Sequence, residues 1–240
     1  MLFVRRKILA VAPCGVIAAA FNHRSVFAGT TDLAVTCDTA AEPAVVAAAR
    51  AFKQRTGVRV RVFPTAPGLV LPQLERQIQN DIIVTQVATI DQAENAGLVA
   101  PGGRVGPWRN RLVIATAAGG KAGTFAVPDP SPASDIDGEA ILQRLGTTTG
   151  TRLGVIDTAA VAWTLTTGGA RQGLLHQTEV TADERLRAVA LVPDSVWPPI
   201  LYAATVTKLA YRGDPAAFVR FLDSAEGQAV LQAAGLEPVS

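Results

Sequence analysis

Short apolar segments with alternating strand-like and helix-like spacing dominate the chain and constrain its fold most strongly. Residues 33–37 and 58–62 read as strands, the second with a period of two, and residues 43–55 place apolar side chains at helical spacing. A second helix is predicted over residues 71–79, and a third strand over residues 82–84. This order predicts a parallel sheet with right-handed crossovers, whose ligands gather beyond the carboxyl ends of the strands.

The same alternation occurs a second time, which favours two α/β lobes over one. The predicted elements are strands over residues 111–116, 125–127, 153–156 and 173–175, with helices over residues 139–145 and 159–166. Residues 215–234 hold two amphipathic segments that are predicted to be packing helices.

The N-terminus has the three parts of a secretory signal peptide. Arg5, Arg6 and Lys7 precede a 14-residue apolar stretch over residues 8–21, which is shorter than the ~20 residues that a membrane-spanning helix needs. Residues 26–28 then offer a cleavage site. We expect residues 1–28 to be a signal peptide removed on export to the periplasm, by either the Sec or the twin-arginine route.

The composition of the exported chain excludes several classes of function. Residues 1–28 hold four of the 22 basic residues and no acidic residue, so the remainder has 18 basic against 20 acidic residues, a formal charge of −2. A weakly acidic protein has no general attraction for nucleic acid. With one Cys and one His left, Cys37 and His176, the usual protein-only zinc sites are excluded. We expect no nucleic-acid partner, metal or cofactor.

The sequence lacks the common signatures of an enzyme. It has no Gly-x-Ser-x-Gly elbow, no His-Glu-x-x-His pair and no phosphate-binding loop. Cys37 and His176 are the nucleophile and base that could face one cleft, but a buried thiol and an unrelated imidazole explain them as well. We therefore expect no catalytic residue.

Polar residues stand at several predicted helix starts. They are Asp38 and Thr39, Ser134 or Asp135, and Asp157 and Thr158, each at the beginning of one helix. Each residue fits a simple helix cap, but the N–H groups at helix starts also bind oxyanions without a charged side chain. Helix starts that converge from two lobes predict a trap for a small solute.

Six stretches follow one another in a characteristic order and spacing: residues 51–58, residues 73–84, Trp108 to Ala115, residues 125–130, Gly173 to Glu179, and Pro198 to Tyr202. Together they resemble the periplasmic molybdate-binding proteins of ABC importers over residues 33–236. The resemblance implies a type II periplasmic-binding-protein fold, with two lobes that are each a mostly parallel sheet flanked by helices, and two crossover strands as hinge. Lobe one then holds residues 30–110 and 198–240, and lobe two holds residues 111–197.

The resemblance also implies which residues hold the ligand. In that family, Ser hydroxyls after the first two strands, helix-start N–H groups and a Tyr surround an oxyanion. The matching positions here are Thr39 beside Ala40, Thr65 and Gly68, the helix starts at Asp135 and Thr158, and His176 in place of the Tyr. Asp38 joins this set because it stands at the same strand end.

The carboxylates near these positions bear on the ligand. At 4 Å and an effective dielectric of about 20, one carboxylate facing a dianion costs on the order of 8 kcal/mol. Either the carboxylates cap helices, or the ligand is not molybdate. We expect a monomeric solute-binding protein that captures a molybdate-like or tungstate-like oxyanion for a membrane permease. The alternatives are another anion, an organic acid or a cation, or a sensor or accessory protein without ligand.

Overall fold

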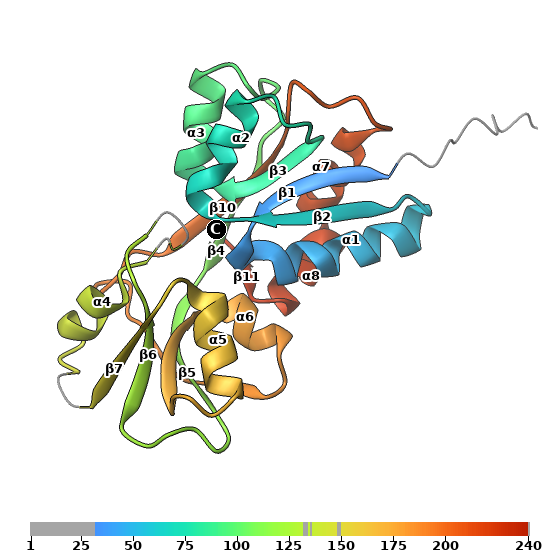
Figure 1. The fold of residues 1–240 in the computed structure, drawn as a ribbon. Helices are drawn as coiled ribbons and strands as arrows, with labels where there is room; N and C mark the ends of the chain where they lie inside the picture. The colour runs from blue at the N-terminus through green and yellow to red at the C-terminus, as the bar shows by residue number, and fades with distance from the viewer. Residues whose placement is uncertain (1–31, 132–133, 135, 148–149, 240) are drawn as a thin grey trace, which may run out of the picture.

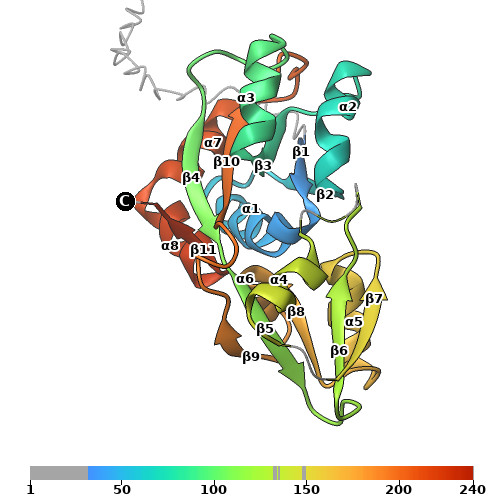
Figure 2. The same ribbon diagram turned by 90° about the vertical axis from the view of Figure 1, so that its left-hand side faces the viewer.

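The computed structural model describes residues 32–131, 134, 136–147 and 150–239. Two mixed sheets with flanking helices form two lobes, which lie one above the other in Figures 1 and 2. Figure 2 shows β4 of the upper lobe continuing into β5 of the lower lobe. The two-lobed α/β architecture expected from the sequence is therefore present.

Lobe one is built on a six-stranded sheet with the order β11-β4-β10-β3-β1-β2. Its strands are β1 (Leu33–Asp38), β2 (Val60–Thr65), β3 (Ile82–Gln86), β4 (Val105–Asn110), β10 (Ile200–Val206) and β11 (Leu236–Pro238). Its helices are α1 (Glu42–Thr56), α2 (Val70–Glu75), α3 (Val87–Asn95), α7 (Pro215–Asp223) and α8 (Ala225–Ala233), with short 3₁₀ turns η1 (Thr39–Ala41) and η2 (Pro67–Leu69).

Lobe two is built on a five-stranded sheet with the order β7-β6-β8-β5-β9. Its strands are β5 (Leu112–Ala117), β6 (Thr124–Pro128), β7 (Thr151–Val155), β8 (Gln172–His176) and β9 (Leu186–Leu191). Its helices are α4 (Gly138–Arg144), α5 (Thr158–Thr166) and α6 (Gln177–Ala182).

Both sheets differ from the expected, mostly parallel arrangement. In lobe one, β1 pairs with β2 and β3 in parallel, whereas β10 is antiparallel to β3 and β4. In lobe two, β6 is parallel to β7 and β8, whereas β5 is antiparallel to β8 and β9. The antiparallel pairs involve the four strands next to the crossovers between lobes, β4, β5, β9 and β10, and also the C-terminal strand β11, which is antiparallel to β4.

Helix α1 shows how the sequence positions the edge of lobe one. Pro43 lies in its first turn, and Gly57 ends it in the left-handed conformation with φ 77°. Phe52 lies in the core against Phe218 and Phe221, at ring-centroid distances of 5.2 and 5.5 Å. This packing holds α1, α7 and α8 on one face of the sheet, and α2 and α3 cover the other face (Figure 1).

Two predicted elements in lobe one have different bounds in the structure. The strand predicted over residues 58–62 is β2, which begins at Val60 and includes Pro64. Proline fits there because β2 is an edge strand, where one row of N–H groups has no partner strand. The helix predicted over residues 71–79 ends at Glu75, and Gln77 follows with a φ of 58° that no helix can continue.

Candidate functional site

The carboxyl ends of β1 and β2 bring four of the predicted site residues together. Asp38 and Thr65 are Cα partners in the last pair of the parallel β1–β2 ladder. Thr39 follows directly as the first residue of η1, and Gly68 lies in η2 after β2. Thr39 and Thr65 are partly exposed, and Gly68 is exposed. Asp38, Thr39, Thr65 and Gly68 thus occupy one edge of lobe one, as the parallel order predicts.

Asp38 does not cap the first helix, contrary to the capping interpretation of the sequence. Its side chain makes no cap hydrogen bond to η1, and its Oδ1 instead accepts a hydrogen bond from Thr85 Oγ1 at 2.7 Å. Asp38 is fully buried and Thr85 comes from the neighbouring strand β3. The sheet order places this partner 47 residues away in sequence, so local capping rules could not identify it.

In lobe two, Thr158 and His176 share one carboxylate, that of Glu179. Thr158 Oγ1 donates to Glu179 Oε1 at 2.7 Å, and the His176 backbone N–H donates to Glu179 Oε2 at 2.8 Å. The His176 Nδ1 lies 3.1 Å from the same Oε2. His176 ends β8, Thr158 begins α5 and Glu179 lies in α6, so one buried network joins three elements.

The sequence analysis did not identify Glu179 as a site residue, although its position in the chain indicates a role at the start of a helix. Glu179 stands three residues after His176, where α6 begins, and a Glu at this spacing commonly accepts a hydrogen bond from the backbone N–H of the residue that starts a helix.

Two helix starts in lobe two are capped by aspartates. Asp157 Oδ1 accepts a hydrogen bond from the Ala160 N–H at 2.7 Å, which supports the capping interpretation for α5. For α4 the predicted start at Ser134 or Asp135 is wrong, because Asp137 caps this helix through the Ala140 N–H at 3.0 Å. Asp135 itself lies outside the described residues.

Cys37 and His176 do not form a nucleophile–base pair. Cys37 packs inside the apolar core of lobe one, whereas the His176 ring lies beside Glu179 in lobe two. Burial raises the pKa of the Cys37 thiol well above its ordinary value, and the negative charges of Asp38 and Glu42 raise it further. A buried, protonated thiol is a poor nucleophile.

The two groups of site residues lie on lobes that touch each other. η1, which starts at Thr39, packs against α5 and α6 of lobe two. The starts of these two helices carry Thr158 and the His176–Glu179 pair. The structure therefore brings Thr39, Thr158 and His176 to elements that meet between the lobes. Asp38, Thr65 and Gly68 share the strand ends of lobe one with Thr39.

A cavity of about 410 Å³ lies where the second crossover enters lobe one. Gln86, Val87, Ala88 and Asp91 line it on one side, and residues 197–201 on the other. Trp197, in the second crossover, forms part of this wall, with the Arg144 guanidinium 5.8 Å from the ring centroid. Gln86 ends β3 and follows Thr85, the partner of Asp38.

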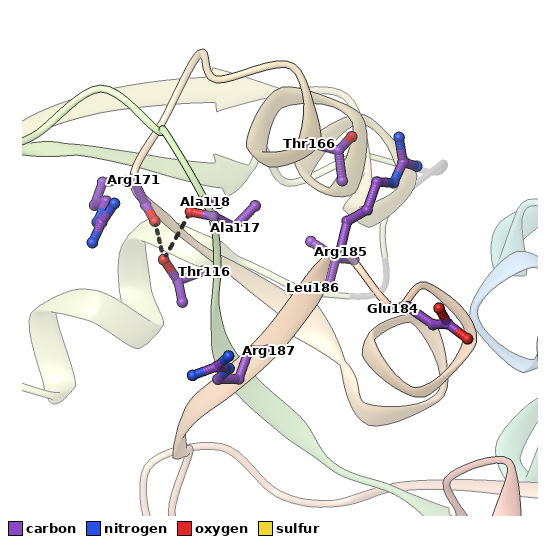
Figure 3. Close-up of a pocket in the computed structure, with 9 residues that line it drawn as sticks. All are labelled: Thr116, Ala117, Ala118, Thr166, Arg171, Glu184, Arg185, Leu186 and Arg187. Atoms are coloured by element: carbon purple, nitrogen blue, oxygen red, sulfur yellow. Dashed lines mark hydrogen bonds between the residues drawn. The ribbon is translucent and has the colours of Figure 1, made fainter.

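Another pocket, of about 530 Å³, lies at the opposite end of lobe two. Figure 3 shows Arg171 and Arg187 beside Thr116, with Arg185 reaching toward Thr166. None of the predicted site residues lines it, and it opens at the end of β5 away from the first crossover. Arg185 is held by Asp183, with Nη2 2.6 Å from Oδ2.

Residues 32–131, 134, 136–147 and 150–239 form neither a candidate metal centre nor a membrane-crossing helix. No three His, Cys, Asp or Glu side chains among these residues gather closely enough to hold a metal ion. No helix formed by these residues is both long and apolar enough to cross a bilayer.

Comparisons with known proteins agree with this architecture. A sequence profile of the family described as "Bacterial extracellular solute-binding protein" matches residues 33–237. A sequence comparison with curated proteins gave no match.

Solved structures share the fold at low sequence identity. The periplasmic molybdate-binding protein of Azotobacter vinelandii has a TM-score of 0.74 and 17% identity, covering 87% of this chain and 100% of that one. PEB3 from Campylobacter jejuni with L-phospholactate bound has a TM-score of 0.66 and 14% identity, covering 87% and 100%. The sulfate-binding protein SubI from Mycobacterium tuberculosis has a TM-score of 0.63 and 17% identity, covering 88% of each chain.

Proposed function

The chain belongs to the bacterial extracellular solute-binding proteins, and on this premise we propose that it captures a small oxyanion between its lobes for the membrane permease of an ABC importer. It acts as a monomer in the periplasm after removal of residues 1–28, and it converts no substrate. Molybdate and tungstate are the first ligands to test, because the similar protein from Azotobacter vinelandii binds molybdate.

The observation that carries this proposal is the placement of the acidic side chains. Asp38 is buried and accepts a hydrogen bond from Thr85, and Asp157 accepts one from the α5 backbone. Each carboxylate is thereby bound within its own lobe. The carboxylate oxygen that each of these residues uses for its bond is thereby turned to a donor of its own lobe and is not offered to a ligand at the strand ends.

The groups that remain at the edge of lobe one suit an oxyanion. The hydroxyls of Thr39 and Thr65 can donate hydrogen bonds, and the backbone around Gly68 can approach a ligand closely because glycine has no side chain. In this proposal an oxyanion lies against these groups and meets the start of α5, where it shares the N-terminal turn with the Asp157 cap and uses the N–H groups that Asp157 does not bind.

A second candidate ligand follows from Glu179. Its carboxylate already accepts hydrogen bonds from Thr158 and from the His176 backbone. These two donors are therefore occupied, and a negative charge lies between them. This favours a ligand that brings a donor or a positive charge of its own, such as a small organic acid with a hydroxyl or ammonium group, or a cation.

Thermal unfolding separates the two candidates. The purified chain is heated with millimolar molybdate, tungstate, sulfate, phosphate, small organic acids or metal cations. A ligand at about a thousand times its Kd adds roughly 4 kcal/mol, or on the order of 8–16 °C for a chain of this size. A shift with molybdate and tungstate supports the first candidate, and a shift with organic acids or cations alone supports the second.

Thr39→Ala then tests the position of the site. We expect at least about a tenfold loss of affinity for the ligand that stabilises the protein, since one hydrogen bond to a charged group contributes roughly 1.5–3 kcal/mol. Thr56→Ala, at the far end of α1, is the matched control and keeps its affinity. Equal affinity in both variants would remove η1 from the site.

A further inference from the structure

A buried cluster of polar groups joins the two lobes at the first crossover. We call it the interlobe cluster; it consists of Asn110, Thr178 and the Ala40 carbonyl. Asn110 ends β4, Thr178 lies in the first turn of α6, and Ala40 lies in η1. Asn110 and Thr178 are fully buried and Ala40 is 4% exposed. The cluster thus links lobe one directly to lobe two, away from solvent.

Hydrogen bonds run in both directions across this cluster. Thr178 Oγ1 donates to the Ala40 carbonyl at 2.5 Å. Asn110 Nδ2 donates to Thr178 Oγ1 at 3.0 Å and to the same carbonyl at 3.3 Å. The Thr178 N–H in turn donates to Asn110 Oδ1 at 3.4 Å. Pulling α6 away from η1 would break several of these bonds and leave buried polar groups unsatisfied, which is costly away from water.

The C-terminal segment of lobe one holds the start of α6 from a second side. Gly235 follows α8, and a Cβ atom at this position would lie 3.0 Å from the Thr178 N and 3.1 Å from the Gln177 carbonyl carbon. Only a residue without a side chain allows this approach of the two backbones. The start of α6 is therefore enclosed by lobe one on two sides.

The cluster is adjacent in sequence to candidate ligand groups on both lobes. Ala40 follows Thr39, and Thr178 precedes Glu179, whose carboxylate binds Thr158. A rigid contact here fixes the Thr39 loop relative to the starts of α5 and α6. The β2 edge with Thr65 and Gly68 lies outside this contact.

We propose that Asn110 and Thr178 form the pivot about which the lobes open and close, so that η1 and the start of α6 stay together at every lobe angle. Asn110 and Thr178 are positioning residues, which act through the neighbouring loops. The half of the cleft between η1 and α6 is then assembled before any ligand arrives, and hinge motion is confined to the half between α2 and α4. This inference does not depend on which ligand is bound.

Distance measurements between spin labels in the ligand-free protein test this proposal. The full chain carries Cys14→Ser and Cys37→Ala, so that only introduced cysteines are labelled. One label pair replaces Arg50 of α1 and Ala182 of α6, two exposed residues that line a groove beside the cluster. The other pair replaces Glu75 of α2 and Gln143 of α4, exposed on lobes that face each other in Figure 2.

We expect a narrow distance distribution for the first pair and one at least about twofold wider for the second. Only the distance between the second pair of labels changes with the angle between the lobes. Two equally wide distributions would show that α6 separates from η1. Two equally narrow ones would show that the lobes do not move. Either result would overturn the proposal.

Thr178→Val, which keeps the shape of the side chain but removes the hydroxyl, should widen the first distribution about twofold while the protein still unfolds cooperatively. Thr181→Val, on the exposed side of α6, is the control and leaves it narrow. Asn110→Ala provides an independent variant with the same expected result. Unchanged distributions in both Thr178→Val and Asn110→Ala would contradict a pivot at this cluster.

Discussion

At the scale of single residues, the Glu179 carboxylate bears most directly on the choice between the two proposed ligands. It lies between the Thr158 hydroxyl and the His176 backbone N–H, and its side chain is 9% exposed. A negative charge at this point repels an oxyanion but attracts a ligand with donors. One substitution therefore separates the two candidate classes of ligand.

Glu179→Gln removes the charge and keeps the shape. If the ligand is an oxyanion, we expect it to bind at least about tenfold more tightly, because one unit of like charge near the site disappears. Calorimetric titration with molybdate measures this change, and Glu184→Gln, an exposed residue after α6, is the control. Weaker binding of the stabilising ligand would show that it donates hydrogen bonds to the carboxylate.

A second prediction at this scale concerns the effect of the Cys37 thiol on how stability changes with pH. Burial, Asp38 and Glu42 raise the pKa of this thiol in the folded state above its unfolded value. Such a group contributes stability below the unfolded pKa of about 8.5, and this contribution is lost as pH rises through the folded pKa. We expect the melting temperature to fall more between pH 8 and pH 10 in the unmodified chain than in Cys37→Ala. Equal falls would show that the thiol ionises as easily folded as unfolded.

At the scale of elements, the ends of strands and helices carry the candidate site, and their caps differ. Asp157, Asp137 and Asp214 each accept a hydrogen bond from the backbone of the helix that they precede. Asp38, in a similar place before η1, bonds across the sheet to Thr85 instead. A helix start without a side-chain cap keeps its N–H groups available, which suits the proposed anion site near Thr39.

The approach of α8 to α6 allows a prediction about Gly235. Its φ is 94°, and a side chain there would also meet the backbone of Thr178. Gly57, at the end of α1, has a φ of 77° but nothing within 4 Å of a Cβ. Gly57→Ala therefore costs only backbone strain, about 1 kcal/mol, whereas Gly235→Ala adds a steric clash and should cost about 2–3 kcal/mol.

Thermal unfolding of these two variants measures the difference. We expect the melting temperature of Gly235→Ala to lie roughly 2–8 °C below that of Gly57→Ala, at about 2–4 °C per kcal/mol for a chain of this size. Equal losses would show that α8 and α6 do not pack closely in solution.

At the scale of the whole molecule, the lobes are joined by two crossovers that differ in character. The first runs from β4 to β5 through Arg111, whose Nε lies 2.9 Å from Glu237 Oε2, beside the interlobe cluster. The hydrogen bond with Glu237 raises the pKa of Arg111. The second runs from β9 to β10 and contains Trp197, Pro198 and Pro199. Buried hydrogen bonds and the Arg111–Glu237 pair hold the first crossover. The second has an ion pair of its own, with Arg109 Nη1 3.6 Å from Asp194 Oδ2, and an apolar stretch that lines the cavity.

Closure of the lobes should therefore be visible through Trp197. Its ring lines the cavity at the second crossover, whereas Trp108 is buried in the core of lobe one and Trp163 is 69% exposed on α5. We expect the tryptophan fluorescence to change when a stabilising anion such as molybdate or tungstate is added. The change should persist in Trp163→Phe and vanish in Trp197→Phe. A change that depends on Trp163 would place the motion elsewhere.

Many of the strands and helices could be predicted from the sequence, because their formation depends mainly on residues close to one another in the chain. The alternation of periods predicted β1, α1, β3 and six elements of lobe two, namely β5, β6, β7, β8, α4 and α5, but not α6 or β9. The bounds of β2 and α2 were wrong, because the edge position of β2 and the left-handed Gln77 are set by the surrounding structure.

Only part of the candidate site could be predicted from the sequence. Its location at strand ends follows from parallel order, and a resemblance in sequence pointed to Thr39, Thr65, Gly68, Thr158 and His176. Their roles as ligand-binding residues remain a prediction. Asp135 lies outside the described residues, and Glu179 entered only when its hydrogen bonds were seen.

The amino-acid sequence by itself determined which segments become strands and helices and which strand ends carry polar groups, since propensity, capping and periodicity act over a few residues. Tertiary structure alone decided that Asp38 binds Thr85 and that Thr178 binds Ala40, 138 residues away. Such contacts depend on the order of strands in a sheet and on how two lobes pack. These are properties of the whole folded chain, because each polar group that is buried takes whichever partner the packing brings within reach.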